Sequence, residues 1–122
     1  RDPTLFPYTT LFRSPTPPPV TLGPGDFFGY TVEHLFGEIW QRPGLTNRDR
    51  RLLLMGLLTG SGQEDVLDIQ LPAALGNGEL TPDDLREIVI FLTHYLGWPR
   101  GARMNQQIEP IISRFQAAGG AS

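Results

Sequence analysis

Few side chains in this 122-residue sequence can do chemistry, because cysteine and lysine are absent and histidine occurs only twice. Without cysteine there is no thiolate for peroxidase or disulfide-reductase chemistry, and without lysine there is no Schiff base. Two histidines, with no carboxylate at metal-ligand spacing beside them, predict no metal site, and no cofactor motif is present. Proton transfer is left to histidines and carboxylates, and anion binding to the ten arginines.

Two residues are the candidates for catalytic proton transfer. His94 lies beside Tyr95 in a helical stretch, and an imidazole exchanges protons near neutral pH. Glu38 precedes Trp40 and acts as a general acid if burial keeps it protonated. The alternatives are a structural histidine at an interface and a glutamate that is exposed or paired with an arginine.

Arg42 and Arg50 are the candidates for binding a carboxylate, because the guanidinium fork matches its two oxygens. The structural alternative for Arg42 is a contact with Glu38 or with a helix C-terminus. For Arg50 and its neighbour Arg51, the alternative is an ion pair with Glu38, Asp49 or another subunit.

Gln70 is a further binding candidate, because its amide interrupts an apolar helical stripe. A buried amide without a partner costs about 1–3 kcal/mol. We therefore expect either a substrate that Gln70 orients or a hydrogen bond across a subunit boundary. Trp40 and Tyr95 are candidates for the wall of a substrate pocket, with core or interface positions as the alternative.

The elements that position these residues are helices, because apolar residues recur at three- and four-residue steps and no alternating strand pattern is present. The sequence predicts an all-α, compact five-helix domain joined by short turns. The expected helices span about residues 27–41, 48–59, 63–75, 82–96 and 101–117. Prolines inside two of them, Pro72 and Pro110, predict kinks or breaks.

Residues 36–55 organise this fold, as the end of one helix, a turn at Pro43-Gly44 and the start of a second helix. Thr46 or Asn47 caps the second helix, and its segment 52–58 is apolar on nearly every face. A helix of that kind is buried on all sides, so we expect it at the centre of the domain.

The helix at residues 82–96 has the clearest start, with Thr81 as N-cap and Pro82 at the first helical position. One of its apolar faces includes Leu85 and Val89, whereas Phe91 and His94 lie on another. Two apolar faces in so small a domain predict that one of them meets a second copy of the chain.

The ends of the chain stand apart from this domain. The segment 4–14 resembles the translation of a sequencing-library adapter, so we exclude residues 1–14 from the fold and expect the true N-terminus to be missing. Residues 15–25 are rich in proline and predict a disordered lead-in. The helical domain spans residues 26–118, and residues 119–122 form a disordered tail.

The charge and hydropathy of the chain exclude several partners. A net charge of −3 gives no electrostatic footprint for nucleic acid or an anionic membrane. No apolar run approaches the ~20 residues of a membrane span. No secretory signal is visible, so the default expectation is a cytoplasmic protein.

Four blocks in the same order carry a resemblance to a known family. They are residues 36–45, 50–58, 73–81 and 95–99. Together they resemble the carboxymuconolactone decarboxylase family over about residues 26–115. The resemblance implies an all-helical fold shared with alkylhydroperoxidase D, and an obligate homo-trimer or homo-hexamer with sites at subunit boundaries.

The family has a peroxidase branch and a decarboxylase branch. The peroxidase pattern of Glu, Cys-x-x-Cys and His would fall on Arg51, Gln63, Val66 and Gln70, so that activity is excluded. The decarboxylase branch acts on a lactone carrying carboxylates, and this chain has Val66 and Gln70 where that branch commonly has Glu and His. Such chemistry needs cations for the carboxylates, stabilisation of a dienolate-like charge and a proton donor.

The resemblance therefore predicts a cofactor-independent lyase, a decarboxylase of a small carboxylated lactone or related ring acid in aromatic catabolism. In this prediction Arg42 and Arg50 bind carboxylate, Gln70 orients the substrate, and His94 or Glu38 moves the proton. The alternative is a non-catalytic oligomer of the same fold that binds a small ligand or is purely structural.

Overall fold

The structure, a computed structural model, describes residues 26–120, so the expectations for residues 1–25 and 121–122 lie outside the described part of the chain. Five helical segments follow one another. They are α2 (Phe27–Tyr30) continuing as a π-helix, η2 (Thr31–Ile39); α3 (Asn47–Gly60); a 3₁₀ turn, η3 (Glu64–Val66), leading into α4 (Leu67–Gly76); α5 (Pro82–Leu96); and α6 (Trp98–Ala117). No strand occurs within residues 26–120, and the predicted all-α fold is confirmed.

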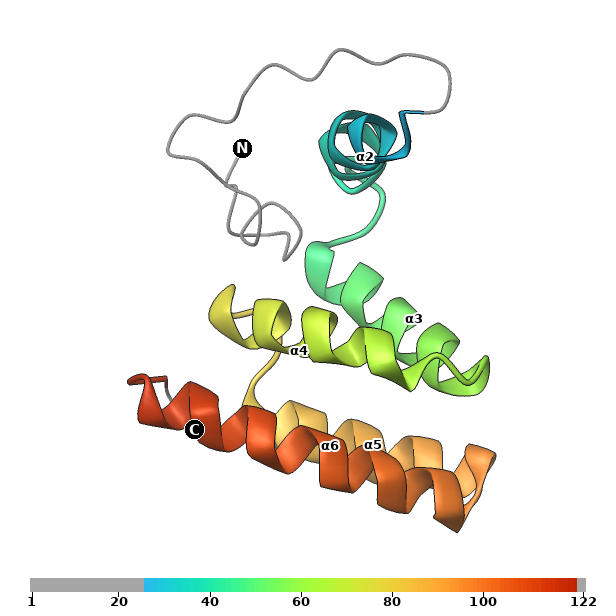
Figure 1. Ribbon diagram of the computed structural model, residues 1–122, viewed down its shortest axis with the longest axis vertical. Coiled ribbons are helices and arrows are strands. Elements are labelled where there is room, and N and C mark those ends of the chain that lie inside the picture. Colours follow the sequence, from blue (N-terminus) through green and yellow to red (C-terminus); the bar gives the residue numbers. More distant parts are fainter. Residues whose placement is uncertain (1–25, 121–122) are drawn as a thin grey trace.

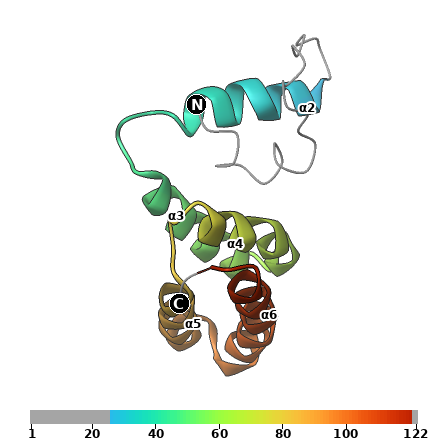
Figure 2. The same cartoon turned by 90° about the vertical axis from the view of Figure 1, so that its left-hand side faces the viewer.

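The helices are arranged in three tiers (Figures 1 and 2). Helices α5 and α6 run side by side, α3 and α4 pack above them, and α2 with η2 stands at the far end, joined to α3 by the loop 40–46. The core fills the space between α3, α4, α5 and α6. Its most deeply buried members include Met55, Leu71, Leu85, Ile108 and Ile112.

The predicted helix starts are borne out by capping geometry. Thr46, rather than Asn47, caps α3: its hydroxyl accepts from the Asp49 N–H at 3.0 Å, and the Asp49 carboxylate accepts in return from the Thr46 N–H. Thr81 and Asp84 form the same reciprocal pair at α5. These two boxes supply partners for N–H groups that have none inside their helices.

The two prolines inside helices, Pro72 and Pro110, were expected to cause kinks or breaks, and neither breaks its helix. Helix α4 continues past Pro72 and α6 past Pro110, and both prolines are exposed. A carbonyl that loses its helical partner on the solvent side can bond to water instead. Helix α6 also begins earlier than expected, at Trp98, because Gly97 turns the chain sharply at φ 100°.

The expectation that α3 is buried on every side is wrong for a single chain. Its buried residues include Arg51, Met55 and Leu58, whereas Leu53 and Leu57 are 63% and 62% exposed. Among residues 26–120 the other helices cover one side of α3 only, and the apolar side that carries Leu53 and Leu57 is left exposed. No helix among residues 26–120 is both long and apolar enough to cross a membrane.

Candidate functional site

A buried arginine stands at the centre of the most unusual polar cluster in the fold. Arg51, in the first turns of α3, is 1% exposed, and its Nε donates to Oε1 of Glu79 at 2.8 Å. Its Nη1 donates to Oε1 of Gln70. Its guanidinium carbon lies 4.9 Å from the centre of the Trp40 ring, within cation–π range. We call Arg51, Gln70, Glu79 and Trp40 the Arg51 cluster.

Trp40 reaches this cluster because the end of η2 packs on α3. Trp40 is buried at the C-terminal end of η2 and meets Phe36 edge to face, with ring centres 6.3 Å apart. Leu54 of α3 packs against this pair of side chains. Since Arg51 and Leu54 are three residues apart on one helix, the same face of α3 carries the cation and its aromatic support.

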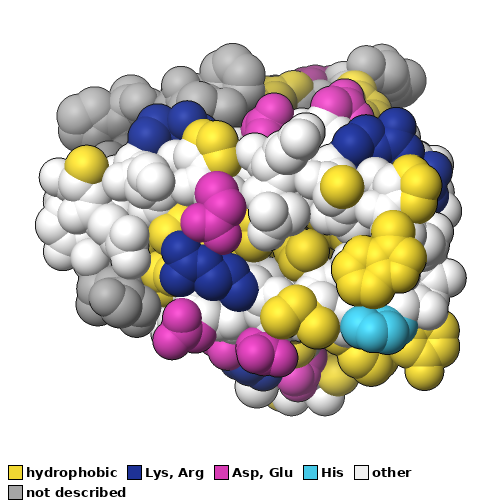
Figure 3. Space-filling model, turned by 90° about the horizontal axis from the view of Figure 1, so that it is seen from below, with side chains coloured by type: hydrophobic (Ala, Val, Ile, Leu, Met, Phe, Trp, Pro, Cys, Tyr) yellow, Lys and Arg dark blue, Asp and Glu magenta, His cyan; other side chains and the backbone are white. Residues whose placement is uncertain are grey.

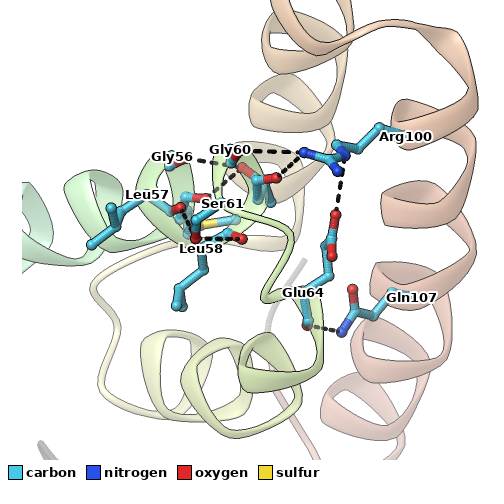
Figure 4. Close-up of polar contacts among 10 residues, drawn as sticks. Gly56, Leu57, Leu58, Gly60, Ser61, Glu64, Arg100 and Gln107 are labelled. Carbon is cyan, nitrogen blue, oxygen red and sulfur yellow. Dashed lines mark hydrogen bonds and ion pairs between the residues drawn. The ribbon is translucent and has the colours of Figure 1, made fainter.

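Polar contacts with α6 hold the turn between α3 and α4 (Figure 4). Arg100 of α6 donates to carbonyls at the end of α3, the nearest at 2.9 Å, and lies 3.3 Å from the Glu64 carboxylate. Gln107 donates to the Glu64 carbonyl oxygen at 2.7 Å. Helix α6 thus fixes the segment that leads into α4, and α4 presents Gln70 to Arg51.

Glu79 comes from the turn between α4 and α5, and its side chain is 6% exposed. One carboxylate oxygen accepts from Arg51, but the other, Oε2, is buried without a hydrogen-bond partner. The Nδ2 of Asn77, in the same turn, is also buried without a partner. Native proteins leave few buried polar atoms unpaired, so this turn has hydrogen-bonding capacity that residues 26–120 do not use.

The Arg51 cluster offers three chemical functions in one place. The guanidinium is a fixed positive charge in a poorly hydrated environment, where it stabilises an anion more strongly than in water. The Gln70 amide nitrogen can donate to a ligand oxygen, and the Glu79 carboxyl can accept or carry a proton. No set of three or more histidine and acidic side chains suited to a metal ion is found in residues 26–120.

Of the seven site residues predicted from the sequence, the structure brings Gln70 and Trp40 into this cluster. Arg50 instead holds the turn before α3, since it donates to the Leu45 carbonyl at 2.7 Å and to the Arg42 carbonyl. The Arg42 side chain is exposed. Both arginines therefore lie outside the Arg51 cluster within one subunit.

The remaining predicted residues lie on the surface. Glu38 is exposed, and its Oε2 lies 3.7 Å from Nδ1 of His34 on the same helix. His94 is also exposed, with Nδ1 2.7 Å from the Ile90 carbonyl oxygen. Tyr95 packs against Phe91 and is exposed as well. None of these side chains is a member of the Arg51 cluster as residues 26–120 form it.

The surface that includes His94 and Tyr95 is apolar, and Figure 3 shows hydrophobic side chains gathered beside a histidine there. A groove of about 400 Å³ runs between α3 and α5. It is lined by Leu52, Gly56, Ile88, Phe91 and Leu92, with Arg48, Asp84 and Glu87 as its charged members. This groove does not include any member of the Arg51 cluster.

Comparison with known proteins identifies the class of this subunit. The model of the carboxymuconolactone decarboxylase family matches residues 25–107 of the 122. The chain belongs to the carboxymuconolactone decarboxylase family, which confirms the resemblance drawn from the sequence blocks.

Two curated relatives are similar over part of their length. The chain is 36% identical over 87 residues to 4-carboxymuconolactone decarboxylase of Acinetobacter baylyi, covering 71% of this chain and 64% of that protein. It is 37% identical over 68 residues to nitrosuccinic acid decarboxylase of Metarhizium robertsii, covering 56% of this chain and 47% of that protein. The chain thus spans roughly half to two thirds of these relatives. No solved structure matches it.

Sequence reasoning missed Glu79 and left Arg51 as one of several arginines. Glu79 follows a Gly-Asn-Gly turn and has no periodic signal of its own. The available hint was Arg51 itself, because an arginine at the start of an apolar helix needs a buried acceptor. The residues between Arg51 and Glu79 offered no means of selecting Glu79 over the other carboxylates.

Proposed function

We propose that this protein is a cofactor-independent decarboxylase of small acids, with the Arg51 cluster as its site. Membership of the family supports this proposal, as does similarity to two relatives that are both named as decarboxylases. The single observation that carries the choice of site is the buried guanidinium of Arg51, held by Glu79 and Gln70 against Trp40.

The names of the two relatives suggest the class of substrate. A carboxymuconolactone and nitrosuccinic acid are both small carboxylic acids with a second group, a lactone carbonyl or a nitro group, that can accept an electron pair onto oxygen. Loss of CO₂ from such an acid leaves an enolate or a nitronate. We therefore propose a substrate with a departing carboxylate and an electron-accepting oxygen group, such as a carboxylated lactone or related ring acid.

In the proposed reaction the carbon–carbon bond to the carboxylate breaks, CO₂ leaves and the electron pair moves onto the oxygen of the accepting group. Arg51 stabilises that oxyanion through its charge, and the Gln70 amide donates a hydrogen bond to it. Trp40 supports the guanidinium and offers a flat apolar wall for the substrate. Removing one donor of this kind typically lowers kcat by about 10²–10³-fold.

We also propose that the chain self-associates, as a homo-trimer or homo-hexamer. The support is the apolar side of the subunit left uncovered by its own helices, which includes Leu53, Leu57, Phe91, Tyr95 and Trp98. Glu38 and His94 lie outside the Arg51 cluster of their own subunit, so either would join such a cluster only from a second copy. Light scattering after size exclusion should give a multiple of the subunit mass, and Leu57→Glu should shift it toward the monomer.

The experiment that tests the proposed activity is CO₂ release by the purified chain from 4-carboxymuconolactone and from nitrosuccinic acid. We expect release from at least one of these acids, reduced about 100-fold in Gln70→Leu. The alternative function, a non-catalytic binder of small carboxylates, has one specific observation in its favour: the Arg51 charge is already balanced by Glu79. Binding of both acids without CO₂ release would establish that alternative.

A further inference from the structure

The groove between α3 and α5 is hollow at a residue that contributes no side chain. Gly56 lies in its wall, and a Cβ placed there meets nothing within 4 Å. The groove has a volume of about 400 Å³. Because a cavity of ~150 Å³ accommodates a benzene ring, this groove has room for two leucine side chains. The subunit thus carries a recess of that size between two of its helices.

The groove is charged at one end and apolar at the other. Arg48, in the first turn of α3, lies 3.6 Å from Asp84, in the first turn of α5, and the two helices run in the same direction (Figure 1). The charged end of the groove is therefore the end at which both helices start. Between Leu52 and Gly60 the sequence of α3 has no charged residue, and the far part of the groove is lined by apolar side chains such as Phe91.

A ridge of leucines stands beside this recess. Leu53 and Leu57 are 63% and 62% exposed, and they lie one helical turn apart on either side of Gly56 in the sequence of α3. Phe91, on the α5 side of the groove, is also 62% exposed. Exposed apolar residues that occur singly are normal, but an apolar ridge beside an apolar groove is typical of an interaction surface. We call the ridge and the groove together the α3–α5 face.

The shape of the α3–α5 face suits a second copy of the same face. A surface that carries a projection and a recess side by side can pack against itself about a two-fold axis, since the ridge of each copy then enters the groove of the other. The centre of such a contact is apolar, whereas Arg48, Asp84 and Glu87 remain at its margin. Stable interfaces have this arrangement, with few charged residues at the centre and a polar rim.

We propose that two copies of the chain pack through their α3–α5 faces about a two-fold axis, with Leu53 and Leu57 of each copy seated in the groove beside Gly56 of the other. The inference rests on the self-association proposed above and specifies its symmetry. A homo-trimer has no two-fold axis, whereas a homo-hexamer made of two trimers does. The α3–α5 face therefore selects the hexamer.

Filling the recess is the first test. Gly56→Met places a flexible apolar side chain in the groove, and methionine is a better helix former than glycine, so the subunit itself should stay folded. Light scattering after size exclusion should give six times the 13.6 kDa subunit mass for the wild-type chain and half of that total for Gly56→Met. Gly56→Ala is the matched control, because one methyl group leaves most of the groove open and should leave the mass unchanged.

The second test is whether the ridge meets its own copy. The chain has no cysteine, so a single introduced cysteine can be crosslinked only to the same residue of another copy. Leu57→Cys should give a covalent dimer with a short bis-maleimide, and adding Gly56→Met should abolish it. Leu45→Cys is the control, since Leu45 is 46% exposed but lies in the loop before α3, outside the α3–α5 face. It should give no dimer.

The outcomes separate this inference from the proposals before it. A wild-type trimer, an unchanged mass in folded Gly56→Met, or no crosslinking of assembled Leu57→Cys above the control overturns the two-fold contact and leaves self-association in place. A wild-type dimer that Gly56→Met converts to a monomer supports the contact and overturns the hexamer. A wild-type monomer overturns self-association as well. None of these measurements depends on CO₂ release, so the proposed activity stands or falls separately.

Discussion

Replacement of Glu79 by alanine is the sharpest test of how the Arg51 cluster is held. Arg51 and Glu79 are 1% and 6% exposed, so the variant leaves a buried guanidinium without its counter-charge. Breaking a buried pair in this way costs about 3–5 kcal/mol of unfolding free energy. For a helical domain of this size, each kcal/mol shifts Tm by about 4–8 °C, so Glu79→Ala should lower Tm by at least ~12 °C.

The assay is thermal and urea unfolding followed by circular dichroism, at one protein concentration because self-association would alter Tm. Glu109→Ala is the control. Glu109 pairs with Arg86, and because these side chains are 41% and 42% exposed, the pair should contribute little to the free energy of unfolding. The double variant Arg51→Met, Glu79→Leu should recover much of the lost stability, because both charges are removed together. If Glu79→Ala unfolds no earlier than Glu109→Ala, the reasoning about the buried pair is refuted.

Two further predictions concern helix packing and pH. Gly101→Ala should destabilise the fold by about 1–3 kcal/mol in urea unfolding, because the new Cβ would clash with Oγ1 of Thr93, a buried side chain. Gly56→Ala, with open space around it, should not. The backbone N–H of Thr81 holds the pKa of Asp84 below its usual value, so Asp84 stabilises the fold above about pH 4, and this contribution is lost as the pH falls through the lowered pKa. The difference in Tm between wild type and Asp84→Asn should therefore be constant near neutral pH and vanish toward pH 2; a difference that persists there would contradict the assignment.

The parts of the fold that local sequence determines were predictable. Thr81-Pro82-Asp83-Asp84 specifies a helix start through side chains within one turn, and the structure has the predicted N-cap Thr81 there, in a capping box with Asp84. The apolar periodicity gave five helices close to their observed bounds. What local pattern cannot give is which side of an apolar helix is covered, and this is why Leu53 and Leu57 were expected inside.

The candidate site was only partly predictable, for a related reason. Gln70 was identified because a polar group on an apolar stripe needs a partner, and that logic is local. Arg51 lies 19 residues before its partner Gln70 and 28 residues before its counter-ion Glu79. Only the packing of the turn after α4 brings these side chains together. Adjacent arginines show the limit well: Arg50 holds a turn, whereas Arg51 is buried, and composition does not distinguish them.

The central claim is that the buried guanidinium of Arg51, and not the exposed Arg42, stabilises the charge that develops as CO₂ leaves. The most direct measurement compares kcat for CO₂ release by Arg51→Lys and Arg42→Lys. Lysine keeps the charge beside Glu79 but loses the planar fork that bonds Gln70 and lies over Trp40. We predict that folded Arg51→Lys loses about 100-fold in kcat while Arg42→Lys stays near wild type. An Arg51→Lys protein with wild-type kcat, or a loss confined to Arg42→Lys, would contradict the claim.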